Sequence, residues 1–296
     1  MSSGDMFPGF ASRHIAVHGA TLHARVGGDG PPVALLHGYP QSHVMWRNVA
    51  PRLAERFTVI VPDLRGYGQS SAPASSGGAA YAKRVMADDI VALMRNLGFA
   101  SFCLAGHDRG GRVAYRLALD YPEAVEKIAV LDIVPTAEMW RAMNAESAMK
   151  VYHWMFLAQP EPLPETLIAG APLAYVDHTL ASWTATNSLD CFADALPHYR
   201  AAFVDPARVH AMCEDYRAGA TLDRDADEAD FAAAKKIEAP LLAIWGESGI
   251  PATGASPLDV WRRWASRATG QAIPGGHFLP EESPEPTLRA LMDFFS

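Results

Sequence analysis

The fold of this chain is decided by one segment, Cys103-Leu104-Ala105-Gly106-His107-Asp108-Arg109-Gly110-Gly111-Arg112. Its apolar beginning, from 101 to 105, predicts a buried strand, and residues 113–119 predict a helix. A Gly-x-Asp-x-Gly pentapeptide lies between the two. A strand that meets a helix at such a sharp turn is typical of a nucleophile elbow, which presents one reactive side chain at the turn.

Asp108 stands where a nucleophile elbow usually carries serine. A carboxylate that attacks carbon becomes an alkyl ester, so we expect no serine-type acyl-enzyme. The sequence therefore predicts covalent catalysis by an aspartate nucleophile.

Arg109 and Arg112 flank this aspartate and lie three residues apart, so they can share one face of the following helix. Cations at a helix N-terminus oppose the helix dipole, and such exceptions are expected at functional sites. Two like charges about 4 Å apart repel by roughly 4 kcal/mol at an effective dielectric constant of 20. An anionic substrate that approaches Asp108 needs compensation, and guanidinium forks suit a carboxylate. The pair therefore predicts a negatively charged substrate.

Short apolar strands alternate with helices along most of the chain. This alternation predicts an α/β fold with a mostly parallel sheet that helices cover on both faces. The expected strands are a hairpin over 14–26 and the segments 32–36, 58–61, 101–105, 129–132, 241–245 and 271–273. The expected helices are 46–54, 81–97, 111–121 and 287–295.

The alternation stops between about 136 and 225, where the chain is rich in Ala, Met, Trp and Tyr with proline punctuation. We interpret this stretch as a helical cap inserted after the strand at 129–132. The core is then expected at 1–135 and 226–296. A helical lid over the carboxyl ends of the strands would close a pocket that excludes water.

A nucleophile of this kind needs an acid and then a base, in that chain order. His277 follows the last predicted strand in a Gly-Gly-His-Phe turn and is the predicted base. Many proteins with such an elbow carry the acid shortly after a Trp-Gly pair that ends a strand. The corresponding segment here, which begins at Trp245, has no aspartate at that place. Asp132, at the end of the preceding strand, is therefore the predicted acid, and Glu247 is the alternative. The acid would hold the imidazole tautomer and stabilise the imidazolium.

The segment His37-Gly38-Tyr39-Pro40 follows an early strand, where an oxyanion-hole loop is expected. The backbone N–H groups of Tyr39 and Arg109 are the predicted donors. A plain tight turn is the alternative interpretation of this segment.

Composition narrows the class of protein. The chain has 296 residues and a net charge of −8, which argues against a nucleic-acid binder. Its three cysteines are far apart and odd in number, so we expect reduced thiols. No apolar run has the length of a membrane span, and residues 1–10 lack the features of a signal peptide. We therefore expect a cytoplasmic protein that does not associate with membranes.

Several motifs together resemble those of the fluoroacetate dehalogenases, which belong to the α/β-hydrolase superfamily. His-Gly-Tyr-Pro-Gln (37–41) and Asp-Leu-Arg-Gly-Tyr-Gly (63–68) are shared across that superfamily, which includes the epoxide hydrolases and haloalkane dehalogenases. The more specific motifs are Gly-His-Asp-Arg-Gly-Gly-Arg (106–112), Tyr-His-Trp (152–154) and Glu-Asp-Tyr-Arg-Ala (214–218). The resemblance extends over nearly the whole chain.

The resemblance implies a complete set of roles. Asp108 is the nucleophile, His277 the base and Asp132 the acid, while Arg109 and Arg112 bind the substrate carboxylate. His153, Trp154 and Tyr216 of the cap donate hydrogen bonds to the departing halide. The implied reaction converts fluoroacetate, or another short 2-haloacid, to glycolate and halide without metal or cofactor, in an enzyme that is commonly a homodimer.

Without the resemblance, we would expect Trp154 in the core and His153 on the surface of the cap.

Two other functions remain open at this point. An epoxide hydrolase shares the aspartate and the histidine, but typically carries Trp after the nucleophile, where this chain has Arg109. A noncatalytic receptor for small acids could also use this fold, and the intact Asp-Asp-His set argues against it.

Overall fold

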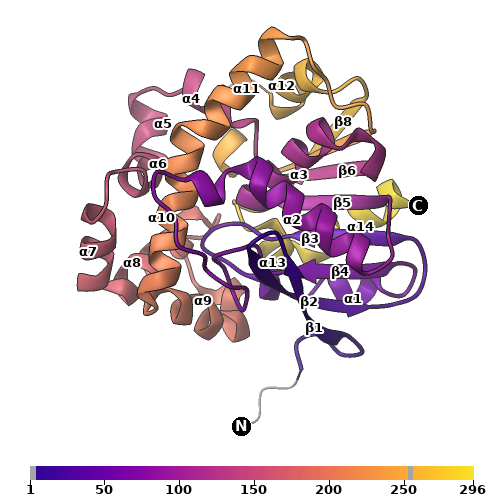
Figure 1. The fold of residues 1–296 in the computed structure, drawn as a ribbon, viewed down its shortest axis with the longest axis horizontal. Coiled ribbons are helices and arrows are strands. Elements are labelled where there is room, and N and C mark those ends of the chain that lie inside the picture. Colours follow the sequence, from indigo (N-terminus) through magenta and orange to yellow (C-terminus); the bar gives the residue numbers. More distant parts are fainter. Residues whose placement is uncertain (1–4, 253–255) are drawn as a thin grey trace.

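An eight-stranded sheet forms the centre of the molecule in the computed structural model, which describes residues 5–252 and 256–296 (Figure 1). The strand order is β1-β2-β4-β3-β5-β6-β7-β8. β1 pairs antiparallel with β2 and β2 with β4, whereas every later pair is parallel. The strands are β1 (Ala11–Val17), β2 (Ala20–Gly27), β3 (Pro32–Leu36), β4 (Thr58–Pro62), β5 (Phe102–His107), β6 (Val125–Leu131), β7 (Leu241–Gly246) and β8 (Ala268–Ile273).

The central strands are nearly continuous apolar runs, because helices cover both faces of the sheet. All six residues of β5 are buried, as are the last four of β3, β4 and β6. α3 (Asp108–Asp120) packs against β5, β6 and α2 (Lys83–Asn96). The other helices of the core are α1 (Ala50–Leu53), α12 (Pro257–Trp264), α13 (Leu279–Glu282) and α14 (Pro284–Phe295), with 3-10 turns η1 (His43–Trp46), η2 (Ala79–Tyr81), η3 (Pro122–Ala124) and η5 (Ile250–Ala252).

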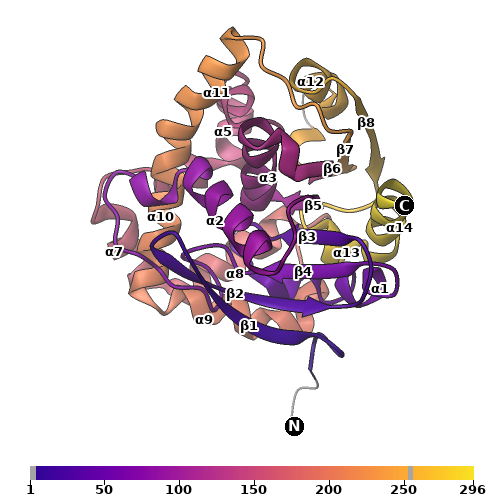
Figure 2. The same ribbon diagram turned by 45° about the vertical axis from the view of Figure 1, so that its right-hand side comes forward.

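Helices alone occupy the chain between β6 and β7, and they gather on one side of the sheet (Figures 1 and 2). We call α4–α11 the cap helices. They are α4 (Thr136–Arg141), α5 (Ala145–Lys150), α6 (Tyr152–Leu157), α7 (Leu163–Gly170), α8 (Pro172–Trp183), α9 (Leu196–Phe203), α10 (Pro206–Ala220) and α11 (Leu222–Ala232), with the 3-10 turn η4 (Asp190–Ala195) before α9. The predicted cap limit at 225 lies inside α11, which continues to Ala232.

Two predicted helices differ from the structure. The expected helix over 46–54 is reduced to η1 and the single turn α1. Pro51 lies in the first turn of α1, a position where its missing N–H is tolerated, and it prevents one continuous helix. The helix expected to begin at Gly111 begins instead at Asp108, and its strand continues to His107.

The expected strands all exist, and the last of them starts earlier than predicted, at Ala268. The three cysteines carry free thiols, as predicted. Within residues 5–252 and 256–296, the helices are too short or too polar to cross a membrane. The predicted core limits of 1–135 and 226–296 include residues 1–4 and 253–255, which lie outside the described residues.

The turn from β5 to α3 is made by a single residue. Asp108 has a φ of 46°, in the left-handed region that side chains other than glycine rarely adopt. The flanking glycines allow the approach of neighbouring backbone that this turn requires. A Cβ atom on Gly106 would lie 2.4 Å from the carbonyl oxygen of Gly110, and one on Gly110 would lie 2.2 Å from that of His37. The pentapeptide is therefore fixed by packing on both sides of Asp108.

We predict that Gly110→Ala lowers the free energy of unfolding by about 1–3 kcal/mol, because the added methyl group meets rigid backbone. Gly170→Ala is the matched control, since Gly170 ends α7 and a methyl group there would meet none of the described atoms within 4 Å. That control is expected to be neutral or to stabilise by about 0.5–1 kcal/mol. Urea unfolding measures both, and equal stability of the two variants would contradict the packing argument.

Candidate active site

Asp108 is a buried carboxylate, with only 5% of its surface exposed. Its Oδ1 accepts a hydrogen bond of 2.8 Å from the backbone N–H of Tyr39. Gly38 permits this approach, because a Cβ there would lie 2.4 Å from the Cβ of Asp108. Arg109 lies in the first turn of α3, where backbone N–H groups have no acceptor within the helix. One oxygen of Asp108 is thus held at the loop predicted to form an oxyanion hole. The other oxygen, Oδ2, lies on the side of His277.

His277 lies between two carboxylates. Its Nδ1 donates to Asp132 Oδ2 over 2.6 Å, and its Nε2 lies 3.8 Å from Asp108 Oδ2. Asp132, with a φ of 53°, also accepts the backbone N–H of Gly246 on Oδ1 at 2.9 Å. Glu247, the alternative acid, is exposed. The geometry therefore brings Asp132 to the imidazole and leaves Nε2 directed toward Asp108.

The charges of this group shift two pKa values in opposite directions. Burial raises the pKa of Asp108, but His277 and the two neighbouring arginines outweigh burial and hold it below its usual range. Burial lowers the pKa of His277, but the hydrogen bond and charge of Asp132, with the charge of Asp108, raise it above 6.5 overall. Asp108 is therefore an ionised carboxylate beside an imidazole that its charge makes more basic.

Arg109 and Arg112 are both buried, with 0% and 2% of their surfaces exposed. Arg109 donates from Nε and Nη2 to Asp215, so only its Nη1 has no hydrogen-bond partner among the described residues. Arg112 donates from Nη1 to the carbonyl of Val134 at 2.9 Å and to Thr136, and its Nε has no partner in the described part of the chain. Protein groups therefore occupy part of each guanidinium, and the predicted role of the two arginines in binding a carboxylate stays a prediction.

The three predicted halide-binding residues come from two cap helices, α6 and α10. Trp154 is 4% exposed, and His153 and Tyr216 are each 2% exposed. The prediction from residues alone that His153 lies on the surface is wrong, because its ring packs against Tyr39 and Trp183. Burial lowers the pKa of His153 to about 3, so the ring is neutral and carries one N–H.

Aromatic and cation–π contacts connect the cap residues to the arginines. The guanidinium of Arg109 lies 4.4 Å from the ring centroid of Tyr216, and that of Arg112 lies 4.5 Å from the ring centroid of Trp154. The rings of His153 and Tyr216 are 5.5 Å apart. Among the buried polar atoms that have no partner within residues 5–252 and 256–296, five belong to this group: Arg109 Nη1, Arg112 Nε, His153 Nδ1, Tyr216 Oη and His277 Nε2.

Buried polar groups in native proteins are normally hydrogen-bonded, so such a concentration of unpaired ones indicates a site for a polar ligand. Most of the unpaired groups are donors or cations, which fits an anion. The carboxylate of Asp108 and the imidazole of His277 adjoin the same group of residues. The arrangement can attack an anionic, electrophilic substrate and then activate water.

A family model for the α/β hydrolase fold matches residues 31–284, which is most of the chain. The chain belongs to the α/β-hydrolase family. The fluoroacetate dehalogenase of Burkholderia sp is 41% identical over 98% of this chain and 95% of that protein. The resemblance found from the motifs is therefore confirmed.

Other relatives of this α/β-hydrolase carry different names. The soluble epoxide hydrolase of Corynebacterium sp. (strain C12) is 32% identical, and the match covers 95% of each chain. A crystal structure from Nostoc sp PCC 7120 superposes with a TM-score of 0.95 at 48% identity, over 98% of this chain and 99% of the other.

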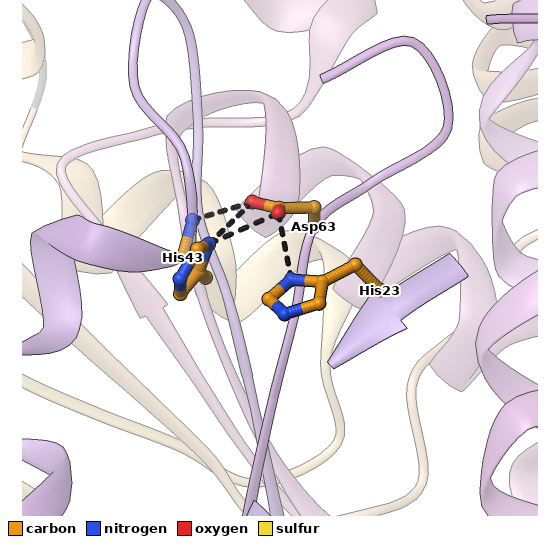
Figure 3. A group of neighbouring side chains, drawn as sticks. All are labelled: His23, His43 and Asp63. Carbon is orange, nitrogen blue, oxygen red and sulfur yellow. Dashed lines mark hydrogen bonds and ion pairs between the residues drawn. The ribbon is translucent and has the colours of Figure 1, made fainter. Parts of the chain in front are cut away.

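This α/β-hydrolase has a second buried group of titratable residues, formed by His23, His43 and Asp63 (Figure 3). The Nδ1 atom of each ring faces the carboxylate, at 3.0 Å for His23 and 2.9 Å for His43. The carboxylate also accepts backbone N–H groups of His43 and Gln69, each at 2.8 Å. Hydrogen bonds therefore occupy its oxygens, and both Nδ1 atoms act as donors rather than as metal ligands.

The hydrogen bonds of His23, His43 and Asp63 instead stabilise the loop that carries Tyr39. His37 Nε2 accepts the backbone N–H of Leu64 at 3.0 Å, directly after Asp63. His23 belongs to β2 and His43 to η1, so one carboxylate joins the edge of the sheet, the 37–43 loop and the turn after β4. Asp63 is the first residue of the Asp-Leu-Arg-Gly-Tyr-Gly motif (63–68), whereas no sequence pattern indicated its two histidine partners.

We predict that Asp108→Ala lowers the pKa of His277, because the variant removes a negative charge that favours the imidazolium. The native pKa is expected above the usual 6.5, and that of the variant below the native one. A pH titration of the ring resonances by NMR measures both values, with His277→Asn to assign the signal. An unchanged or raised pKa in Asp108→Ala would show that the two groups are not electrostatically coupled.

Proposed function

We propose that this α/β-hydrolase cleaves the carbon–halogen bond of short 2-haloacids, fluoroacetate first, and releases glycolate and halide. One observation carries the proposal: the nucleophile is a carboxylate, Asp108, and two buried arginines adjoin it. A carboxylate nucleophile suits displacement at a saturated carbon, and buried cations suit a substrate with its own negative charge. The similarity to a fluoroacetate dehalogenase supports the same reaction.

In the first step, Asp108 Oδ2 attacks the α-carbon of the haloacid. A carbon–oxygen bond forms, the carbon–halogen bond breaks, and its electron pair leaves with the halide. Arg109 Nη1 and Arg112 Nε, both buried and without a partner among the described residues, would hold the substrate carboxylate. Because these cations offset the repulsion between two carboxylates, attack becomes possible in a buried site.

The departing halide would be received by the cap. His153, Trp154 and Tyr216 each offer one uncharged donor, and the hydroxyl of Tyr216 and one ring nitrogen of His153 have no other partner in the described ranges. Hydrogen bonds to an ion are stronger than those between neutral groups. Fluoride is small and strongly basic, so it gains most from such donors.

In the second step, His277 removes a proton from water, which attacks the carboxyl carbon of the Asp108 ester. The negative charge that develops on Oδ1 is stabilised by the N–H of Tyr39, which already contacts this oxygen, and by that of Arg109. Collapse breaks the bond between that carbon and the ester oxygen, and the imidazolium of His277 returns its proton to that oxygen as glycolate leaves. The Asp108 carboxyl then loses the second proton of the water to solvent, which restores the carboxylate. Asp132 holds Nδ1 throughout and stabilises the imidazolium.

Formation of the ester also prepares the base. The negative charge of Asp108 raises the pKa of His277 in the free enzyme, and esterification removes that charge. The pKa of His277 therefore falls in the ester. The imidazole is then more readily neutral at the stage when it must accept a proton from water.

Epoxide hydrolysis is the second candidate, because a soluble epoxide hydrolase is 32% identical and covers 95% of the chain. The hydroxyl of Tyr216, unpaired within the described residues, could protonate an epoxide oxygen. Arg109 next to the nucleophile favours the haloacid instead. Halide release from fluoroacetate, measured beside diol formation from styrene oxide, separates the two functions.

We predict that His277→Asn traps the first intermediate, because alkylation of Asp108 needs no base and hydrolysis of the ester does. Intact-protein mass spectrometry after incubation with fluoroacetate is expected to show one added carboxymethyl group. Asp108→Ala is the control and is expected to show none. An unmodified His277→Asn protein that also releases no halide would mean that His277 acts before or during attack.

We predict that Tyr216→Phe and His153→Asn lower fluoroacetate turnover by roughly 10- to 100-fold, because one hydrogen bond to a charged group contributes about 1.5–3 kcal/mol. Chloroacetate turnover is expected to fall substantially less, since chloride is larger and less strongly hydrated. Steady-state rates on both substrates test this. Equal losses would assign these residues to pocket shape or closure rather than to fluoride.

A further inference from the structure

Behind Arg109 lies a buried ion pair that the mechanism above does not use. Lys83 is the first residue of α2 and is 1% exposed, and Asp215 of α10 is completely buried. The ammonium of Lys83 forms an ion pair with Oδ1 of Asp215. Buried lysines are rare unless they are paired, because the desolvation of a charge is costly.

Asp215 holds the guanidinium of Arg109 in one orientation. Its Oδ1 accepts from Nε at 3.1 Å and from Nη2, and its carbonyl oxygen accepts from Nη2 at 2.7 Å. The second carboxylate oxygen accepts the hydroxyl of Tyr67 at 2.7 Å. Gly219 lets the helix approach, since a Cβ there would lie 3.1 Å from Nη2. Of the three guanidinium nitrogens, only Nη1 lacks a partner among the described residues and is left for a ligand.

The charges of this group balance only because Lys83 is present. Burial raises the pKa of Asp215, but Arg109 and Lys83 outweigh burial and keep the carboxyl ionised. Asp223 adds a further negative charge, with Oδ2 at 3.6 Å from the Lys83 ammonium and Oδ1 bound to the Lys83 backbone N–H at 2.7 Å. The two cations and two anions therefore form a neutral group, and loss of Lys83 would leave it with a net negative charge that repels an anion.

We propose that Lys83 and Asp215 are positioning residues for a carboxylate ligand. Asp215 orients Arg109 so that Nη1 alone meets the substrate, and Lys83 offsets the charge of Asp215 so that the site still attracts an anion. This inference rests on the proposed function only in that the ligand is a small carboxylate. Neither residue touches the reacting atoms.

The test is a double-mutant cycle on charge. The variants are Lys83→Met, Asp215→Asn and the two together. Lys127→Met is the matched control, because it removes the same charge from β6, where Lys127 donates to the carbonyl of Phe294 at 2.8 Å. Calorimetry measures the affinity of each protein for glycolate and for neutral glycolamide, and halide release from chloroacetate gives kcat and KM.

Lys83→Met is expected to weaken glycolate binding about tenfold, because a nearby positive charge is lost, and to leave glycolamide binding within about twofold. The double variant restores the charge balance and is expected to recover most of the glycolate affinity. Asp215→Asn is expected to keep that affinity but to lower kcat about tenfold, because Arg109 is no longer held in place. Lys127→Met is expected to change neither ligand's affinity.

Equal losses for glycolate and glycolamide in Lys83→Met would assign the pair to structure alone and overturn the proposal, as would a double variant without recovery. If Lys83→Met does not fold, as judged by thermal melting, the double variant compared with Asp215→Asn measures the same charge. Absence of halide release by the native enzyme would refute the proposed dehalogenation, while the two affinities still decide the role of Lys83 and Asp215. If the native protein binds glycolate no better than glycolamide, the site does not select an anion, and the positioning role of Lys83 and Asp215 is overturned.

Discussion

The arrangement of charge around one buried carboxylate governs the structure of this site. Asp108 is ionised although it is buried, and burial alone would raise its pKa. Arg109, Arg112 and His277 outweigh that effect, and each of them is oriented in turn by a further group. Asp132 holds His277, and Asp215 holds Arg109. The reactive centre is therefore the inner part of a larger buried network of ions.

The elbow sets the position from which this network is built. The left-handed conformation of Asp108 points its side chain toward the 37–40 loop, and close backbone contacts at Gly106 and Gly110 fix that conformation. The loop is itself held by the hydrogen bonds around Asp63, at the opposite end of β4 from Thr58. Local strain at one residue is thus supported by long-range packing, as is expected where backbone geometry serves a reaction.

The cap helices complete the site rather than merely cover it. They bring uncharged donors, His153 and Tyr216, to a core that supplies the charged groups. α10 has two tasks, because Tyr216 faces the arginine with its ring while the neighbouring Asp215 binds the same guanidinium. A shift of this helix would therefore move Tyr216 and the carboxylate that orients Arg109 together.

The sequence by itself predicted the alternating strands and helices, the elbow at Asp108 and the helical insertion, because these features depend on neighbouring residues and on apolar periodicity. It favoured Asp132 over Glu247 as the acid, and it did not indicate the protein groups that bind the two arginines. Only the tertiary structure brought Asp132 to a histidine 145 positions away and placed Asp215, 106 positions beyond Arg109, against that guanidinium. Contacts between such distant side chains depend on how helices and strands pack, and no local pattern records that packing.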